Sequence, residues 1–355
     1  MRRISFIFAV FLLAPLCGLI WGLSGEASFS QVLFPSEQMI LQTETLFSNM
    51  KQLNEVVSDL QRQIGFIQAS VAEQERIYRE QQLLIQKLVQ KSRQQKTLSD
   101  ELYEKEILAR LGTPFEVFRS NRVEIKLFDL KEKDYKGYIA KVKVFDPEAV
   151  QVVLAQDQLG KSETTSEAVQ RKGAVLGING GGFYKTYNEG QLQYWPIGTT
   201  MIDSEMITGF SPTHDDLFFT GFDKKGRLIG GLFEEERELL ALNPRDGVSF
   251  VPVLLKNREA KEIPEKWRNE KHPRTVLGQY ANGDLIFLVI DGRQPGWSAG
   301  ATLEEVQIKL LELGVVDAYN LDGGGSTTMV YKGKVLNRPS DGKERRVATN
   351  IVVLP

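Results

Sequence analysis

Three successive patterns of apolar and polar residues divide this chain. The first is an almost unbroken apolar run from Ile4 to Leu23, directly after two arginines. The second is a long stretch dominated by Gln, Glu, Lys, Arg and Leu, and the third alternates short apolar runs with turn residues. The patterns predict a signal-anchor helix at 1–23, a linker at 24–36, a helical stalk at 37–111 and a folded domain at 115–355.

The first segment has the length and flanks of a membrane anchor. About twenty apolar residues cross a bilayer as a helix, whereas the apolar core of a cleaved signal is usually about 7–15 residues long. Basic residues before the run favour a cytoplasmic N-terminus and place the rest of the chain outside the cytoplasm. We therefore expect a domain held at the membrane, in the periplasm or at the cell surface. Cleavage near Gly25-Glu26-Ala27 would instead release it as a secreted protein.

The second segment shows heptad spacing. Two positions of the repeat, three residues apart, carry mainly apolar side chains: Met50, Val57, Ile64, Val71, Tyr78 and Ile85, and Leu53, Leu60, Ile67, Gln74, Gln81 and Leu88. This arrangement is typical of a parallel two-stranded coiled coil, so we predict a homodimer. The alternative is an intrachain helical hairpin that bends at Gly65. Neither alternative implies chemistry, and the segment is interpreted as a stalk.

Composition and charge exclude several classes of function. A formal net charge of -2 leaves no basic excess for binding nucleic acid. The chain has one cysteine, which lies in the leader, and two histidines. These counts argue against zinc clusters, a disulfide framework and a cysteine nucleophile.

Beyond Gly112-Thr113-Pro114, which ends the helix, the pattern indicates an α+β domain with a mixed β-sheet and helices. The Asn282-Gly283 pair between two apolar runs predicts a hairpin. Other expected elements are strands at 123–130, 135–145, 150–155 and 174–178, a helix at 164–172, and turns near Asp203-Ser204 and Lys224-Lys225-Gly226.

The stretch from Asp284 to Tyr319 predicts a strand, a helix and a second strand. Thr302-Leu303-Glu304-Glu305 is a capping box that opens the helix, and Gly314 ends it. A crossover of this length makes the two strands parallel. Asp291 and Asp322, which follow those strands, are therefore expected on one sheet edge, where they can be neighbours. The strand before Asn179 also follows a helix, so Asn179 is expected to reach the same crevice.

Two glycine triplets stand out, Gly180–Gly182 after Asn179 and Gly323–Gly325 after Asp322. A fold keeps such a run where the main chain turns sharply or touches something closely. Bare amides, with the hydroxyls of Ser326 and Thr327, can surround an anion. The alternative is a tight surface turn, and the repetition of the pattern favours a site.

Five motifs resemble those of the phosphodiester glycosidase domain family, which includes the animal uncovering enzyme and bacterial exopolysaccharide-associated proteins. They are Asn179-Gly180-Gly181-Gly182-Phe183, Arg274-Thr275, Asp291-Gly292-Arg293, Asn320-Leu321-Asp322-Gly323-Gly324-Gly325-Ser326, and Pro339-Ser340-Asp341 with Arg345-Arg346-Val347. The resemblance covers roughly 115–355, is tightest from Arg274 onwards, and excludes the anchor and the stalk. It implies hydrolysis of a sugar–phosphate diester at the anomeric carbon, with release of free sugar and a phosphomonoester. The chain lacks the cysteines of the animal enzyme, which fits a bacterial relative.

Candidate roles follow from this chemistry. Because glycosidases usually employ two carboxylates, we expect Asp322 to act as nucleophile or general base and Asp291 as second carboxylate or sugar-hydroxyl ligand. Guanidinium groups match phosphate oxygens, and the glycine loops and amides supply further donors. Asn320 is predicted as a third catalytic residue, which, like Asn179, would orient sugar hydroxyls or the attacking water. The predicted phosphate and substrate ligands are Asn179, Gly180, Gly181, Arg274, Arg293, Gly323, Gly324, Gly325, Ser326, Thr327 and Arg346.

Three alternatives remain open from the sequence. No cofactor is expected, although Asp and Asn side chains converging on one edge can bind a hard cation such as calcium. The domain could instead be a non-catalytic envelope scaffold that binds glycan on a coiled-coil stalk, or a purely structural coiled-coil adaptor. A carboxylate beside a phosphate cradle favours the enzyme, acting on a glycan or sugar phosphate.

Overall fold

The computed structural model describes residues 36–188 and 190–355. The chain divides into two compact units, Met1–Lys91 and Ser92–Pro355. The expected anchor at 1–23 and nearly all of the linker lie outside the described residues. Among the helices that the structure does describe, none is both long enough and apolar enough to cross a membrane.

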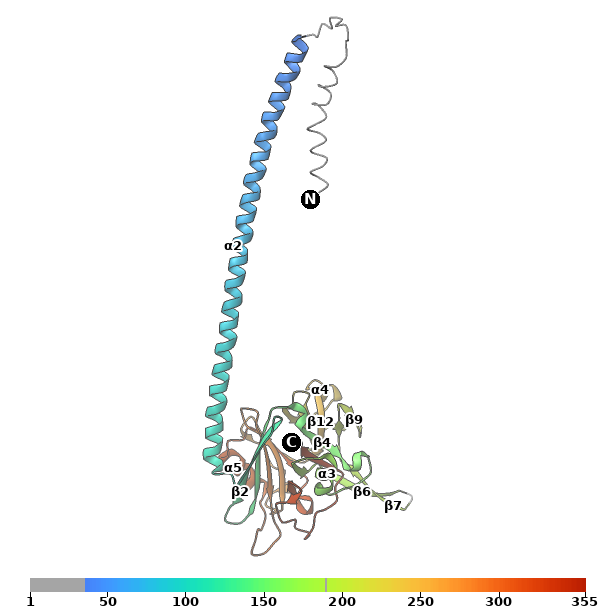
Figure 1. Ribbon diagram of the computed structural model, residues 1–355. Helices are drawn as coiled ribbons and strands as arrows, with labels where there is room; N and C mark the ends of the chain where they lie inside the picture. Colours follow the sequence, from blue (N-terminus) through green and yellow to red (C-terminus); the bar gives the residue numbers. More distant parts are fainter. Residues whose placement is uncertain (1–35, 189) are drawn as a thin grey trace, which may run out of the picture. The chain divides into compact units, whose positions relative to one another are not determined.

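The predicted stalk is a single helix, α2 (Ser36–Leu111), drawn in blue to cyan in Figure 1. It continues without a break through Gly65, so the bend required by the hairpin alternative is absent there. The apolar heptad residues are solvent-exposed along the helix; Leu53, for example, is 64% exposed. Gly112 follows with a left-handed φ of 83°, a conformation that favours glycine, and Pro114 prevents continuation.

The domain is built on an eight-stranded sheet in which every neighbouring pair is antiparallel. In spatial order its strands are β1 (Glu116–Arg119), β2 (Val123–Lys131), β3 (Lys136–Val144), β16 (Leu285–Ile290), β15 (Arg274–Gln279), β17 (Asp317–Leu321), β13 (Val253–Lys256) and β14 (Glu259–Ala260). Within this sheet, β16 is apolar throughout because both of its faces are buried. Leu285, Phe287 and Val289 enter one core, and the alternate residues enter the other.

Two five-stranded sheets complete the larger core, on the side to which Phe287 points. One contains β11 (Leu228–Gly231), β10 (Phe218–Asp223), β12 (Pro244–Phe250), β8 (Met201–Ile202) and β9 (Glu205–Met206). The other contains β19 (Lys334–Val335), β18 (Met329–Tyr331), β5 (Leu176–Asn179), β20 (Thr349–Val353) and β4 (Val150–Leu154). A separate hairpin is formed by β6 (Phe183–Asn188) and β7 (Gln191–Pro196).

Three short helices cover this framework: α3 (Thr165–Lys172), α4 (Glu236–Leu240) and α5 (Leu303–Glu312). The predicted capping box of α5 is present, because Thr302 and Glu305 each accept the backbone amide of the other. Val306 and Leu310 of α5 join the second core, together with Ile107 from the end of α2. The expected α+β class is confirmed, but the expected mixed sheet is wrong, because all strand pairs among the described residues are antiparallel.

The crossover from β16 through α5 to β17 has the predicted direction but not the predicted neighbours. Strand β15 lies between β16 and β17 and pairs antiparallel with both, so β16 and β17 run parallel to each other without touching. Their carboxyl ends therefore reach the same edge as the first residue of β15. Asp291 and Asp322 emerge at this edge on either side of Arg274.

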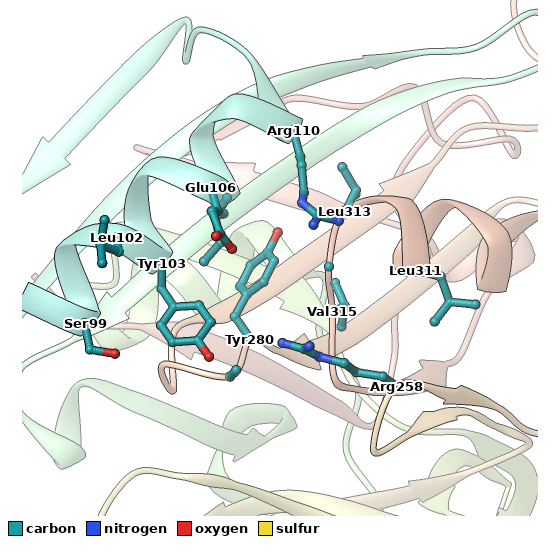
Figure 2. Close-up of a pocket in the computed structure, with 13 residues that line it drawn as sticks. Ser99, Leu102, Tyr103, Glu106, Arg110, Arg258, Tyr280, Leu311, Leu313 and Val315 are labelled. Atoms are coloured by element: carbon teal, nitrogen blue, oxygen red, sulfur yellow. The ribbon is translucent and has the colours of Figure 1, made fainter. Parts of the chain in front are cut away.

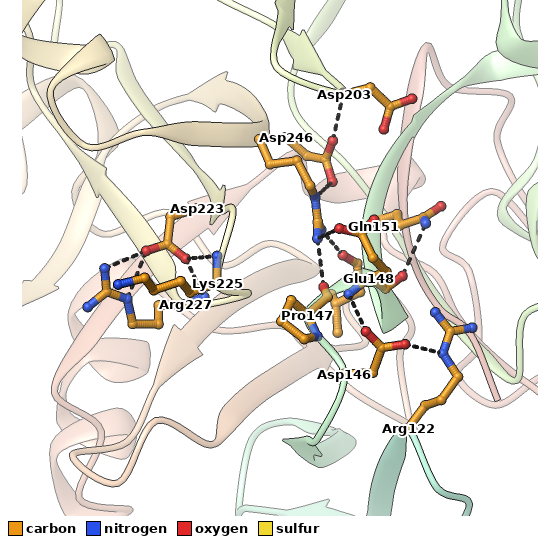
Figure 3. A network of polar contacts seen from close by, with 12 residues as sticks. Arg122, Asp146, Pro147, Glu148, Gln151, Asp203, Asp223, Lys225, Arg227 and Asp246 are labelled. Atoms are coloured by element: carbon orange, nitrogen blue, oxygen red, sulfur yellow. Dashed lines mark hydrogen bonds and ion pairs between the residues drawn. The ribbon is translucent and has the colours of Figure 1, made fainter. Parts of the chain in front are cut away.

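A polar network connects the smaller sheets to the β3–β4 connection (Figure 3). The Arg245 guanidinium on β12 donates to Asp246 Oδ2 at 2.8 Å and to the carbonyl of Pro147 at 2.6 Å. The other oxygen of Asp246 accepts the amide of Asp203 in the β8–β9 turn at 3.0 Å. These contacts give the buried Arg245 guanidinium hydrogen-bond acceptors. They also hold β12 in place, and β12 packs against the glycine corner at Gly181.

Candidate active site

The edge where β16 and β17 end forms a pocket of about 220 Å³. Its walls come from the loop before β15, the loop after β16, the glycine turn after β17 and the C-terminal loop. The lining residues are Phe250, Val251, Trp267, Glu270, His272, Arg274, Arg293, Leu303, Asn320, Asp322, Gly323, Gly324, Gly325 and Arg345. Among the predicted residues, the pocket brings together Asp322, Asn320, Arg274, Arg293 and the second glycine triplet.

Asp322 has the properties of a reactive carboxylate. It directly follows β17 and lines the pocket, yet surrounding protein removes most of its hydration. Burial raises the pKa of Asp322 to about 6, and the Ser326 hydroxyl, the Arg345 charge and the Gly323 amide act in the opposite direction. A carboxyl group with this pKa exchanges protons readily near neutral pH.

Two arginines in the pocket form no ion pair with any described acidic residue. Arg274 is 7% exposed, and it donates to the carbonyls of Ala301 and Glu270 at 2.9 and 2.7 Å. Burial lowers the pKa of Arg274 to about 10. Because a buried guanidinium without a carboxylate partner is unfavourable, Arg274 and the nearby Arg293 are suited to bind an anion.

A chain of side chains orients Arg293. Glu270 Oε2 lies 2.8 Å from Nε2 of His272, and Nδ1 of His272 lies 3.1 Å from an Nη atom of Arg293. With Nε2 protonated, a neutral His272 donates to Glu270 and accepts from Arg293. All three side chains line the pocket.

Two further polar atoms on the pocket wall lack protein partners within the described part of the chain. Asn320 donates its amide to the carbonyl of Val251 at 2.7 Å, but Asn320 Oδ1 is buried without a hydrogen bond. The indole Nε1 of Trp267 is in the same situation. Buried polar atoms are normally satisfied, so an unpaired acceptor and an unpaired donor in one pocket indicate a place for a polar ligand.

A wider cavity of about 640 Å³ adjoins this pocket and shares Asp322 and Arg345 with it. Its other walls are Phe183, Lys185, Tyr194, Asp341, Lys343, Glu344 and Arg346. Arg345 donates to Asp341 at 2.7 Å, so this pair stands at the boundary between the two spaces. Arg346 is held by Glu167 and the carbonyl of Ser162, at 2.9 and 2.7 Å. The predicted arginine Arg346 is thus already engaged and lies outside the smaller pocket.

Asp291 does not line either cavity, which contradicts its expected place as a second carboxylate in the pocket. Its side chain is fully buried and accepts from Trp297 Nε1, Asn337 Nδ2 and the Arg338 amide at 2.8, 3.1 and 2.8 Å. Burial raises the pKa of Asp291, and these hydrogen bonds act in the opposite direction. The carboxylate fastens the loop that carries Arg293 to the C-terminal segment.

The first glycine triplet is also placed differently from the expectation. Asn179 is completely buried; its amide donates to the Asp322 carbonyl at 2.6 Å and its oxygen accepts from Thr275 and from the Thr328 amide. Gly180 and Gly181 pack against β20 and β12, where an added Cβ would lie 2.5 Å from Thr349 Oγ1 and 2.7 Å from the Ser249 carbonyl. Asn179, Gly180 and Gly181 thus support the Asp322 turn from behind.

The second triplet borders the pocket, but several amides in and after it donate to main-chain carbonyls. Gly324 N–H donates to the Pro273 carbonyl, and the amides of Ser326 and Thr327 donate to carbonyls within the turn. Ser326 and Thr327 are buried and line neither cavity. The amides of Gly324, Ser326 and Thr327 are therefore not free to surround an anion, which leaves the arginines as the main anion-binding groups of the pocket.

Four pocket residues with polar side-chain atoms were not predicted as site residues: Trp267, Glu270, His272 and Arg345. No motif in the sequence marks Trp267, Glu270 or His272 as a site residue. The available signals were short distances in sequence. His272 precedes Arg274 by two residues, and Arg345 adjoins the predicted Arg346.

The structure offers no cluster for the cation considered from the sequence. Across residues 36–188 and 190–355, no group of three or more His, Cys, Asp or Glu side chains is placed to hold a metal ion. Asp291 is enclosed by hydrogen-bond donors, whereas Asp322 lines the pocket. The two carboxylates therefore do not point into one shared cavity.

A cavity of about 470 Å³ lies at the opposite edge of the sheet, between the end of α2 and the turn after β15 (Figure 2). Tyr280, which follows β15, lies in its centre, whereas Arg274 begins the same strand. Six residues of strand separate them, or roughly 20 Å. None of the predicted site residues lines this cavity.

The fold and pocket define an α+β domain in which one pocket contains a carboxylate and two arginines that form no ion pair with any described acidic residue. Residues 172–354 match the family described as phosphodiester glycosidase. The chain therefore belongs to the phosphodiester glycosidase family, and the resemblance noted in its sequence is confirmed.

Several known proteins are similar to the domain. An uncharacterized protein of Bacillus subtilis, the SPbeta prophage-derived YomE, is 28% identical over 195 residues, covering 54% of this chain and 29% of that protein. Bovine (Bos taurus) N-acetylglucosamine-1-phosphodiester alpha-N-acetylglucosaminidase is 28% identical over 213 residues, covering 54% of this chain and 38% of the enzyme. The matched regions thus span about a third of the length of these two relatives.

Among solved structures, the zebrafish catalytic domain of the same enzyme, auto-inhibited by its pro-peptide, superposes with a TM-score of 0.54 at 23% identity. The superposition covers 67% of this chain and 85% of the zebrafish chain. This likeness supports the fold assignment.

Proposed function

We propose that the domain hydrolyses the anomeric bond of a glycosyl phosphodiester in a glycan outside the cytoplasm. Water adds to the anomeric carbon, the bond from that carbon to the phosphate oxygen breaks, and the oxygen keeps the electron pair. The products are a free sugar and a phosphomonoester. Because the leaving phosphate is a weak base, with a conjugate acid of pKa about 6 or lower, the reaction needs little help from a general acid.

Asp322 is proposed as the group that acts on the anomeric carbon, directly or through the attacking water. Arg274 and Arg293 bind the phosphate, with Arg345 at the mouth of the pocket. The unpaired Asn320 Oδ1 and Trp267 Nε1 are suited to sugar hydroxyls. His272 and Glu270 act as positioning residues because they hold Arg293 in place.

One observation carries the proposal. One pocket contains the Asp322 carboxylate, with a pKa of about 6, and Arg274, a buried guanidinium that forms no ion pair with any described acidic residue. A site that only binds phosphate gains nothing from a carboxylate in this position, because the charges repel. The arrangement suits a substrate whose reacting carbon and anionic group lie next to each other.

The test is hydrolysis of a sugar-1-phosphate diester by the full chain. We expect wild type to release free sugar, and Asp322→Asn to lose activity by about a thousandfold or more, since the reacting group is removed. Ser166→Ala, a substitution at a surface position outside the pocket, serves as the control. If wild type and Asp322→Asn are equally inert while both bind glycan, the domain is a non-catalytic scaffold.

For α2 we propose that a second copy of the chain covers the apolar heptad face. An isolated helix of 76 residues with an exposed apolar stripe gains stability by burying that stripe against another helix. A membrane anchor at 1–23, with the domain in the periplasm or at the cell surface, remains our proposal for localisation. Such a stalk would hold two domains at a distance from the membrane.

The dimer is tested by sedimentation of the full chain. Replacing Leu53 and Leu60 with Glu places charges in the proposed seam and should give monomers. Phe66 is 77% exposed but lies outside the heptad seam, so Phe66→Glu is a matched control that should leave the dimer intact. A monomeric wild-type chain would contradict the proposal.

A further inference from the structure

The β6–β7 hairpin has an unusual position beside the active site. It follows the first glycine corner directly, forms its own two-stranded sheet and extends away from the rest of the domain (Figure 1). Two strands alone are marginally stable in water. The hairpin nevertheless exposes large aromatic side chains, with Tyr187 78% and Tyr184 51% exposed.

The strand register sorts these side chains onto two faces. Tyr187 pairs with Leu192 and Lys185 with Tyr194, so these four residues share one face. Tyr184 pairs with Trp195 and lies on the opposite face. We call the side with Tyr187, Leu192, Lys185 and Tyr194 the Tyr187 face.

The Tyr187 face is continuous with the active site. Lys185 and Tyr194, together with Phe183, line the 640 Å³ cavity that also contains Asp322 and Arg345. The rings of Phe183 and Tyr194 stack with centroids 5.4 Å apart, and Lys185 Nζ lies 5.0 Å from the Tyr194 centroid. Tyr187 and Leu192 extend the same surface outward along the strands.

The surface at the mouth of this cavity is also charged. Within residues 36–188 and 190–355, neither Lys185 nor Lys343 forms an ion pair, although both are exposed and line the cavity. Arg345 and Arg346 add two more cations, each balanced by an acidic neighbour. Two lysines without ion pairs in a cavity that also contains aromatic rings suit a ligand that combines sugar rings with negative charges.

We propose that the Tyr187 face binds successive units of a negatively charged glycan chain whose reacting sugar occupies the pocket at Asp322. This inference rests on the proposed function and defines its substrate class as polymeric. Tyr187 lies four residue steps, roughly 13 Å, beyond Phe183 on the cavity wall, so a single sugar phosphate at Asp322 does not reach Tyr187. Tyr187 and Leu192 contact the apolar faces of sugar rings, while Lys185 and Lys343 bind anionic groups.

The experiment compares two tyrosines on opposite faces of the hairpin. Tyr187→Ala should raise KM for a phosphodiester-linked polysaccharide by about fivefold, with kcat unchanged. The same variant should leave kcat/KM for a small sugar-1-phosphate diester unaltered, because that substrate ends short of the hairpin. Tyr184→Ala is the matched control and should leave KM and kcat unchanged for both substrates.

Charge is tested with Lys185→Gln and Lys343→Gln. The double variant should weaken binding of the anionic polymer at low salt and reduce the dependence of KM on ionic strength. A neutral polysaccharide of similar length should bind both proteins equally weakly. The proposal would be overturned if these variants lowered kcat/KM equally for the small and the polymeric substrate. It would also be overturned if Tyr187→Ala and Tyr184→Ala had equal effects.

The outcome separates this inference from the proposed function. Binding of the polymer to Asp322→Asn, measured by calorimetry, should be weakened by Tyr187→Ala whether or not the wild type is active. If the wild type is inert but Tyr187→Ala still weakens polymer binding, only the proposed hydrolysis is contradicted. If the wild type is active but Tyr187→Ala does not weaken polymer binding, only the hairpin subsite is contradicted.

Discussion

The two glycine triplets look alike in the sequence and do different things in the structure. Both follow an apolar strand and an Asn or Asp. At Gly180–Gly182, added Cβ atoms would meet main chain and packed side chains of β12 and β20, including Val248 and Phe250. At Gly325 the added atom would meet the tips of Arg345 and Asp341, which line the active-site cavities. The first corner requires glycine for packing throughout. In the second, Gly323 also packs against main chain, at Pro273, whereas Gly325 makes room for functional side chains.

The hydrogen bonds show how the corners depend on each other. Asn179 binds the Asp322 carbonyl, and the Gly180 carbonyl accepts the Asp322 amide at 3.3 Å. The first corner is therefore a rigid support, while the second presents the carboxylate. The comparison teaches that a repeated motif can divide support and chemistry between its two copies.

The largest effect is expected from Gly181→Ala. Its Cβ would lie 2.7 Å from the Ser249 carbonyl and 2.8 Å from Val248 Cβ, neither of which can move without disturbing β12. We expect a loss of about 3 kcal/mol or more in the free energy of unfolding, or no folded protein. Urea denaturation measures it. Gly65→Ala, at an open position in α2, is the control and should be neutral or slightly stabilising.

A smaller effect concerns the titration of Asp322. Its folded-state pKa of about 6 lies above the unfolded value, so its stability contribution is present below about pH 4 and is lost as pH rises through 6. Asp322→Asn should therefore be more stable than wild type at pH 7, by roughly 2 kcal/mol, with little difference at pH 4. In the active wild type, kcat/KM should fall about tenfold per pH unit below 6, because the proposed reaction requires the carboxylate.

These pH effects are measured by urea denaturation at both pH values and by a kcat/KM profile. An equal stability of the two proteins at pH 7, or an activity profile flat from pH 5 to 7, would contradict the raised pKa of Asp322.

The smallest effect is expected from Gly325→Ala. The tips of Arg345 and Asp341 are partly exposed and can move aside, so the free energy of unfolding should change by less than about 1 kcal/mol. Displacing Arg345 from the pocket mouth should lower kcat/KM by about tenfold. Thermal unfolding and kinetics on the small diester measure both. If Gly325→Ala unfolds like Gly181→Ala, the proposed difference between the corners is wrong.

Much of the fold could be predicted because its signals are local. The strand at 123–130, the Asn282-Gly283 hairpin and the capping box at Thr302 all occur close to their expected bounds. The shared edge of Asp291 and Asp322 also followed from the handedness and length of the crossover. The order of strands did not, because β15 inserts between β16 and β17 through pairing that no local pattern encodes.

The site was predictable where a motif carried it and not where packing decided. Asp322, Asn320, Arg274 and Arg293 lie in one pocket. Asp291 is of the same residue type and also follows a strand, yet Trp297 and Asn337 enclose it. Burial and hydrogen-bond partners come from distant segments, so residue type and spacing could not separate these two aspartates.

By itself, the sequence determined the long helix, the α+β class, the family and the chemical groups available, because periodicity, capping and motifs act over short distances along the chain. Only the tertiary structure decided which aspartate faces a cavity, which glycine corner is a support, and which arginines lack acidic partners. Those properties depend on dehydration and on contacts between residues far apart in the chain, and both exist only once the sheets have packed together.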